Sequence, residues 1–278
     1  MYGSVSGIHK SATRGSSVEF AEYRKYAQGD DIRHVDWRVY ARSDRFFMKE
    51  FEADTNLRCY LVLDTSGSME FGSGQVNGSK FEFARRMIAT LAYLLIHQGD
   101  AVGLLCFADG AVHDIPPRRT PSHLRNLFDV LGTVKPSGET KIPETIHRLA
   151  ERVKQRALVI VFSDLFAEVP LLLDCFEHMK FKKHDLAVFH LLDRQEASFV
   201  FDRPIRFVDM ENGATVTTDP SIMRETYLKE FDGYLHDLKH GCEEFGVDYR
   251  RVFTDSDYEK VLAALLLERL NKRAGKSL

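Results

Sequence analysis

Cysteine is scarce in this sequence, and no two cysteines stand in a Cys-x-x-Cys spacing. The four that occur are Cys59, Cys106, Cys175 and Cys242. Cys59 and Cys106 lie inside apolar, strand-like runs, where a cysteine usually serves as a small buried hydrophobic residue. This usage argues against both a disulfide framework and a thiolate zinc site.

Long apolar runs and an excess of charge of one sign are also missing. No uninterrupted apolar segment approaches the ~18 residues that a membrane span requires. Residues 1–7 lack the apolar centre of a signal peptide. The formal net charge is only −3, so no general positive field would attract nucleic acid or anionic lipid. We therefore expect a cytoplasmic protein that has no membrane span and no nucleic-acid partner.

The residues that are present have the composition of an ordinary globular protein, with 44% hydrophobic and 28% charged residues. Residues 1–55 combine Gly, Ser, Arg, Asp and aromatic residues with little periodicity, whereas beyond them short apolar runs alternate with amphipathic segments. This alternation is typical of strand–helix units around a largely parallel sheet. We therefore predict an N-terminal accessory segment at residues 1–55, packed on a main α/β domain at residues 56–278.

Apolar periodicity places the elements of that domain. Buried strands are expected at residues 57–63, 101–107, 157–162, 186–192 and 247–253, with a short strand at 111–115. Helices are expected at residues 80–97, 121–131, 142–154, 170–180 and 227–245, and again around 261–266. Asn212-Gly213 predicts a hairpin insertion near residues 205–217, because glycine tolerates positive φ.

Two of the apolar strands end in aspartate. Asp64 forms the pattern Asp-x-Ser-x-Ser with Ser66 and Ser68, and Asp164 follows the second strand. Between them, Thr140 places a hydroxyl ahead of a helix. Taken alone, Asp-x-Ser-x-Ser is more often a polar strand end whose hydroxyls cap the next helix. Doubly wound sheets, however, bind ligands at the carboxyl ends of strands where the strand order reverses, so neighbouring strands would bring all five side chains together.

This set of side chains contains only oxygen ligands. Carboxylates and hydroxyls without imidazole or thiolate suit Mg²⁺ or Mn²⁺. Because Mg²⁺ keeps several waters and accepts few carboxylates, the two carboxylates and three hydroxyls leave room for a further oxygen from outside the chain. The sequence therefore predicts a divalent-cation site at Asp64, Ser66, Ser68, Thr140 and Asp164.

The same pattern resembles the metal-ion-dependent adhesion site of von Willebrand factor A domains, since all five residues fall on positions of that motif. In that family a carboxylate of the protein ligand completes the metal. The resemblance implies a von Willebrand factor A-like (Rossmann-like) α/β fold, with a central, mostly parallel sheet flanked by helices. It also implies a non-enzymatic module that binds an acidic residue of a partner protein.

A second resemblance covers nearly the whole chain. Its N-terminal part consists of Gly7-Ile8-His9-Lys10-Ser11, Arg14-Gly15, Glu19-Phe20, Tyr23-Arg24, Tyr26, Gly29-Asp30-Asp31, Arg33, Asp36-Trp37 and Ala41-Arg42. Its later part consists of residues 98–104, 163–165, 184–185, 191–193 and 207–213. These strings are similar to a bacterial family catalogued as domain-of-unknown-function family 58. The resemblance implies a MoxR-type AAA+ ATPase, often encoded beside such proteins, as a partner in the assembly or maturation of a client complex.

Other interpretations stay open at this point. The same cation could activate water in a metal-dependent hydrolase or phosphatase, although no residue near the metal loops stands out as a general base. The site could also be vestigial in a structural domain. Residues 29–38 interleave aspartate with arginine, a mixture that more often forms an ion-pair network than a second metal or phosphate site. We expect that network to fix the accessory segment, with Trp37 buried in it.

Overall fold

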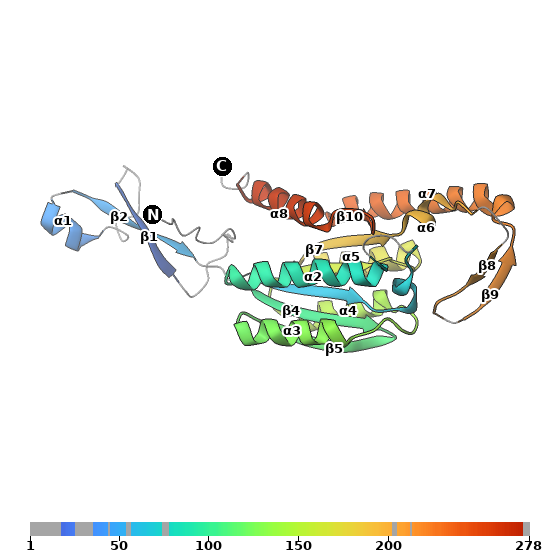
Figure 1. Cartoon of the computed structure of the whole chain (residues 1–278). Helices are drawn as coiled ribbons and strands as arrows, with labels where there is room; N and C mark the ends of the chain where they lie inside the picture. The colour runs from blue at the N-terminus through green and yellow to red at the C-terminus, as the bar shows by residue number, and fades with distance from the viewer. Residues whose placement is uncertain are drawn as a thin grey trace. The chain divides into compact units, whose positions relative to one another are not determined.

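The computed structural model of the protein (Figure 1) describes residues 18–25, 36–43, 45–53, 57–73, 78–201, 205–211 and 213–274. The chain divides into two units, one of residues 1–57 and 270–278 and the other of residues 58–269. The sequence placed its boundary at residue 55, and the packing of the accessory segment on the main domain stays a prediction. No helix in the described part of the chain is both long and apolar enough to cross a bilayer.

The first unit contains a two-stranded antiparallel sheet and a short helix. β1 (Val18–Lys25) pairs with β2 (Phe47–Ala53), and α1 (Trp37–Ser43) lies between them in the chain. None of these elements was predicted, because this part of the sequence shows little apolar periodicity. The greater part of the mixed-charge cluster, at residues 29–35, lies outside the described residues.

Trp37 is the first residue of α1 and is 57% exposed. Its ring makes edge contacts with Tyr40 and Phe46, at centroid distances of 6.1 and 6.4 Å. The expectation of a buried Trp37 is therefore wrong. The sequence of this segment mixes charged and aromatic residues without helical periodicity. It therefore does not indicate which aromatic ring of a short helix is exposed to solvent.

Trp37→Ala should consequently have a small effect on stability. An exposed ring removes little apolar surface from water, so we expect a loss well below the ~3–5 kcal/mol of a buried aromatic truncation. Phe176→Ala truncates a fully buried ring of the second unit and should cost that full amount. Thermal unfolding followed by circular dichroism measures both variants. Equal losses in the two would contradict the exposed position of Trp37.

The second unit is built on a six-stranded sheet of order β10-β7-β6-β3-β4-β5. Its strands are β3 (Arg58–Asp64), β4 (Ala101–Ala108), β5 (Gly110–Arg118), β6 (Leu158–Ser163), β7 (Asp185–Leu192) and β10 (Asp248–Phe253). All neighbours in this sheet are parallel except β4 and β5. Strands covered on both faces need apolar residues at every position, and every residue of β6 is buried.

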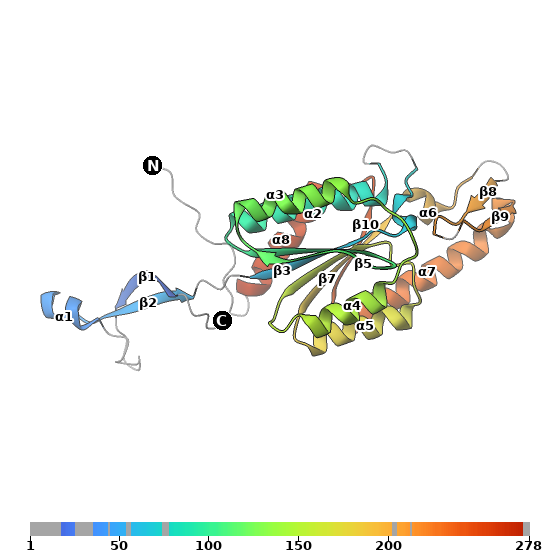
Figure 2. The same ribbon diagram turned by 90° about the horizontal axis from the view of Figure 1, so that it is seen from below.

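Helices cover both faces of this sheet (Figure 2). The longer helices are α2 (Lys80–His97), α3 (Pro121–Thr133), α4 (Ile142–Arg152), α5 (Val169–Phe181), α7 (Pro220–Glu244) and α8 (Tyr258–Ala274). α2 and α3 lie on one face, and α4, α5 and α7 lie on the other, where they share a core with β3, β4 and β6. Two short helices, η2 (Gly67–Glu70) and α6 (Arg194–Ser198), follow β3 and β7. This arrangement confirms the predicted mostly parallel α/β fold.

The strand order reverses between β3 and β6. From β3 the chain proceeds to β4 and β5 on one side, and it then returns to β6 on the other side. β3 and β6 are parallel neighbours, with Leu63 opposite Phe162. Their carboxyl ends therefore meet where sheets of this kind bind ligands. Between α6 and α7, a separate antiparallel hairpin is formed by β8 (Ile205–Val208) and β9 (Thr215–Thr218).

Candidate metal centre

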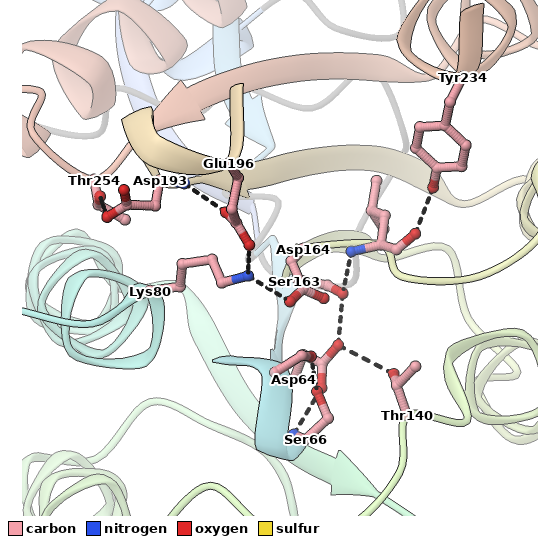
Figure 3. A network of polar contacts seen from close by, with 12 residues as sticks. Asp64, Ser66, Lys80, Thr140, Ser163, Asp164, Asp193, Glu196, Tyr234 and Thr254 are labelled. Atoms are coloured by element: carbon pink, nitrogen blue, oxygen red, sulfur yellow. Dashed lines mark hydrogen bonds and ion pairs between the residues drawn. The ribbon is translucent and has the colours of Figure 1, made fainter. Parts of the chain in front are cut away.

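Asp64 and Asp164 lie close together at the carboxyl edge of the sheet (Figure 3). Asp64 is the last residue of β3, and Asp164 directly follows Ser163, the last residue of β6. The two aspartates are buried, with exposed fractions of 0% and 8%. Two buried carboxylates at adjacent strand ends are costly unless hydrogen-bond donors or a cation compensate their charge.

Three donors hold the carboxylate of Asp64. The main-chain amide of Ser66 donates to Oδ1 at 2.9 Å. The hydroxyls of Ser163 and Thr140 both donate to Oδ2, at 2.6 and 3.2 Å (Figure 3). These bonds orient the carboxylate and place the Thr140 hydroxyl against it, although Thr140 lies 76 residues from Asp64 in the chain.

The loop that carries Thr140 is tied to the loop after β3 by main-chain hydrogen bonds. Gly67 N donates to Gly138 O at 2.9 Å. Ser137 N donates to Thr65 O at 2.8 Å. Gly138 has a φ of +80°, which glycine adopts without the steric cost that a side chain would add. This docking keeps Thr140 at the end of β3.

Ser66 and Ser68 complete the group of hydroxyls. Their Oγ atoms lie 3.0 Å apart, at the start of the turn that forms η2. The Ser68 hydroxyl also helps to lower the pKa of Asp164. The structure thus brings together all five residues that the sequence singled out: Asp64, Ser66, Ser68, Thr140 and Asp164.

Lys80, which the sequence did not single out, forms a buried ion pair with Asp164 and a partly buried one with Glu196 at the same place. Its side chain is 2% exposed, and Nζ donates to Asp164 Oδ2 at 2.8 Å and to Glu196 Oε1 at 2.7 Å. Glu196 is held by a capping box, because its Oε2 accepts a hydrogen bond from Asp193 N at 2.7 Å. Figure 3 shows Lys80 reaching between these two carboxylates.

A signal for Lys80 exists in the sequence. Ser79 caps α2 by accepting a hydrogen bond from Glu82 N at 3.2 Å, so the helix begins at Lys80. From there, the buried stripe continues at helical spacing through Ala84 and Met87. A lysine in line with an apolar stripe indicates a buried charge that needs partners.

The pKa values of the two aspartates are shifted in opposite directions. Burial, together with the charge of Asp164, raises the pKa of Asp64 to about 7, although hydrogen bonds from Ser163 and Ser66 oppose the shift. Burial pushes the pKa of Asp164 upward, but the Lys80 ammonium, helped by the Ser68 hydroxyl, holds that pKa below its usual value. Burial lowers the pKa of Lys80, and its two carboxylate partners more than reverse this. Lys80 therefore compensates the charge of Asp164 rather than that of Asp64.

Two carboxylate oxygens near the site are buried without a hydrogen-bond partner among the described residues, Asp164 Oδ1 and Glu211 Oε1. Glu211 lies after β8 in the hairpin, and its Oε2 accepts a hydrogen bond from Thr140 N at 3.2 Å. Oxygens in this state fit a site that takes a cation or its bound water. Over the described ranges, no group of three or more His, Cys, Asp or Glu side chains is arranged to hold a metal. A cation here would depend on hydroxyls as well as carboxylates.

Residues 22–233 match the model of a family described as Protein of unknown function DUF58. The chain belongs to this family. An uncharacterized protein of Mycobacterium tuberculosis strain H37Rv is similar to this DUF58 member at 23% identity over 261 residues, which cover 92% of this chain and 81% of the mycobacterial protein. The predicted resemblance to domain-of-unknown-function family 58 is confirmed.

Solved structures resemble this DUF58 member in fold. An aerotolerance-related membrane protein from Bacteroides fragilis is 20% identical and has a TM-score of 0.52, with 78% of this chain and 99% of that chain covered. The SpRpn10 VWA domain is 11% identical and has a TM-score of 0.46, with 73% and 92% covered. The likeness to the Bacteroides fragilis structure, together with the order of the six-stranded sheet, confirms the predicted mostly parallel α/β fold.

The prediction of a cytoplasmic location is contradicted by the first of these likenesses, because the Bacteroides fragilis protein is described as a membrane protein. The prediction relied on the lack of a signal peptide and of a long apolar run in the sequence. That reasoning fails because an α/β domain buries the same core whether or not it lies beside a membrane. The residues of such a domain do not record its location.

Proposed function

We propose that this protein is a metal-dependent protein-binding module, in which Asp64, Ser66, Ser68, Thr140 and Asp164 hold Mg²⁺ or Mn²⁺. The observation that carries the proposal is Asp164 Oδ1. This oxygen is buried and lacks a hydrogen-bond partner among the described residues, whereas Oδ2 of the same carboxylate is bound by Lys80. Carboxylates that bind metals are usually hydrogen-bonded by neighbouring groups, and the contact with Lys80 leaves Oδ1 available for a cation.

The charges around the site favour a cation. The carboxylates that gather around Lys80 and Thr140 are those of Asp64, Asp164, Glu196 and Glu211. His190 adds no positive charge near neutral pH, because burial lowers its pKa to about 4. The remaining negative charge would attract a divalent ion. The neutral hydroxyls would leave that ion with positive charge to offer a further ligand.

That further ligand is proposed to be an acidic side chain of a partner protein. Its binding needs charge attraction but no proton transfer, so the proposed role is non-enzymatic. Glu196 is poorly placed to act as a general base, because it is ion-paired with Lys80 and accepts a hydrogen bond from Asp193 N. We propose a MoxR-type AAA+ ATPase, or the client complex that it acts on, as the partner.

Asp64→Ala and Ser66→Ala should abolish the binding of Mg²⁺ or Mn²⁺ and the metal-dependent capture of a partner, while the fold stays intact. Isothermal titration measures the metal, and a pull-down from native cells with and without EDTA measures the partner. EDTA should have the same effect as the two substitutions, and circular dichroism should be unchanged. Asp129→Ala removes an exposed carboxylate of α3 and should behave like the wild type.

The same proteins distinguish binding from catalysis. The wild-type protein should show no turnover of phosphoesters, peptides or nucleotides above background. Metal-dependent hydrolysis that disappears in Asp64→Ala would defeat the binding module and support a hydrolase. Undiminished metal binding in both Asp64→Ala and Ser66→Ala would show that the cation binds elsewhere.

A further inference from the structure

The β8–β9 hairpin brings an acidic turn onto the metal loops. Both views show it reaching back toward the end of the sheet where η2 lies (Figures 1 and 2). A Cβ placed on Gly67 would lie 2.2 Å from Met210 O and 3.4 Å from Glu211 Cα. Gly67 stands between the two serines of the site, so the lack of a side chain there allows the hairpin turn to approach them.

The close approach of the turn places Glu211 next to the metal loops. Its Oε2 accepts a hydrogen bond from Thr140 N at 3.2 Å, while the hydroxyl of the same threonine donates to Asp64 Oδ2. Burial raises the pKa of Glu211, and the nearby Ser68 hydroxyl opposes that rise. Glu211 therefore lies beside two of the three hydroxyls that are proposed to hold the metal.

The turn holds Glu211 in this position. Asp209 Oδ1 accepts a hydrogen bond from Glu211 N at 2.8 Å. The main chain of Asp209 also accepts a hydrogen bond from Gly213 N at 2.9 Å and donates one to Ala214 O at 2.8 Å. Glu211 Oε1 nevertheless stays buried and without a hydrogen-bond partner in the described structure, as does Asp164 Oδ1. A cation at the site, or a water bound to it, would satisfy both oxygens.

We infer that Glu211 is a metal ligand supplied by the chain itself, which occupies the position that a partner's acidic side chain takes when it binds. This inference rests on the metal-dependent function proposed above. Metal binding alone then gives a closed state, in which the hairpin shields the cation. Partner binding exchanges one carboxylate for another, so it is a competition rather than a simple addition.

The construction of the hairpin suits such an exchange. Its two strands form a sheet of their own, without ladder hydrogen bonds to the six-stranded sheet. A two-stranded hairpin alone is marginally stable, and Val208, Met210 and Val216 are between 42% and 59% exposed. Within β8, Phe207 stacks on Phe199 with ring centroids 5.6 Å apart. The hairpin is therefore anchored through β8, while the turn has few apolar contacts to lose.

The test uses Mn²⁺ as the probe of the site and acetate as the probe of the exchangeable position. The Glu211→Ala and Glu211→Gln variants each lack one carboxylate ligand. Isothermal titration should therefore show that they bind Mn²⁺ about tenfold more weakly than the wild type, or weaker still. A water should replace the lost ligand, so the proton relaxivity of bound Mn²⁺ should rise. Acetate should lower that relaxivity in Glu211→Ala and leave the wild-type value unchanged. Glu139→Ala, an exposed neighbour of Thr140, is the matched control and should resemble the wild type.

The outcomes separate this inference from the proposed function. If the wild type binds Mn²⁺ through Asp64, and Glu211→Ala has the same affinity and relaxivity as the wild type, Glu211 is not a ligand and the inference fails alone. If neither protein binds Mn²⁺ in a manner that depends on Asp64, the metal site and the inference fail together. Circular dichroism of each variant confirms that a changed affinity does not come from unfolding.

Discussion

In the presence of EDTA, Asp64→Asn should melt at a higher temperature than the wild-type protein above about pH 4. Burial and the charge of Asp164 raise the pKa of Asp64 in the folded protein to about 7, against a usual value of 3.8. Between these values the folded state keeps a proton that the unfolded state loses, so stability falls as the pH rises. The advantage of Asp64→Asn should grow over this range, level off above about pH 7 and amount to roughly 5–10 °C.

Saturating Mg²⁺ should reduce the advantage of Asp64→Asn over the wild-type protein. A ligand at 100 times its Kd stabilises the folded state by about 2.7 kcal/mol, and only the wild type has the site intact. Scanning fluorimetry from pH 4 to pH 8, with EDTA or with Mg²⁺, gives both comparisons. Asp129→Asn should melt at the same temperature as the wild type, both with EDTA and with Mg²⁺. A metal-free Asp64→Asn that is less stable than the wild type at pH 8 would show that the three hydrogen-bond donors already compensate the Asp64 charge.

Lys80→Met should destabilise the protein by about 3–5 kcal/mol, because it leaves the buried Asp164 carboxylate without its counter-charge. Lys80 bonds to Asp164 and Glu196 at 2.8 and 2.7 Å, and its side chain is 2% exposed. Methionine fills a similar volume, so the loss reports the charge rather than a cavity. At this chain length the melting temperature should fall by about 10 °C.

Two comparisons test the cause of this loss. Lys239→Met removes a lysine that is 66% exposed and lies 3.7 Å from Glu243, so it should cost less than about 1 kcal/mol. Adding Glu196→Gln to Lys80→Met should restore part of the stability, since one uncompensated carboxylate is neutralised. Urea unfolding of the single and double variants gives the values. A Lys80→Met loss no larger than that of Lys239→Met would contradict a buried ion pair.

The candidate ligands could be predicted from the sequence because each belongs to a short local pattern. An apolar run that ends in aspartate shows the end of a buried strand, and a hydroxyl ahead of a helix shows a loop at the same edge. In a sheet of parallel strands, these ends have few places to lie. Asp64 and Asp164 therefore came together as expected, and the strands and most helices were placed within a few residues. The prediction of the location failed because no local pattern in the domain encodes where the protein resides.

By itself, the sequence determined the alternating elements, the family and the set of candidate oxygen ligands, since these follow from periodicity, motifs and residue type. Only the tertiary structure decided which charges meet at the site. Lys80 lies 84 residues from Asp164 and 116 from Glu196 along the chain. Glu211 reaches Thr140 across 71 residues. Electrostatic energy depends on separation in space and on burial, and neither is a property of a local pattern.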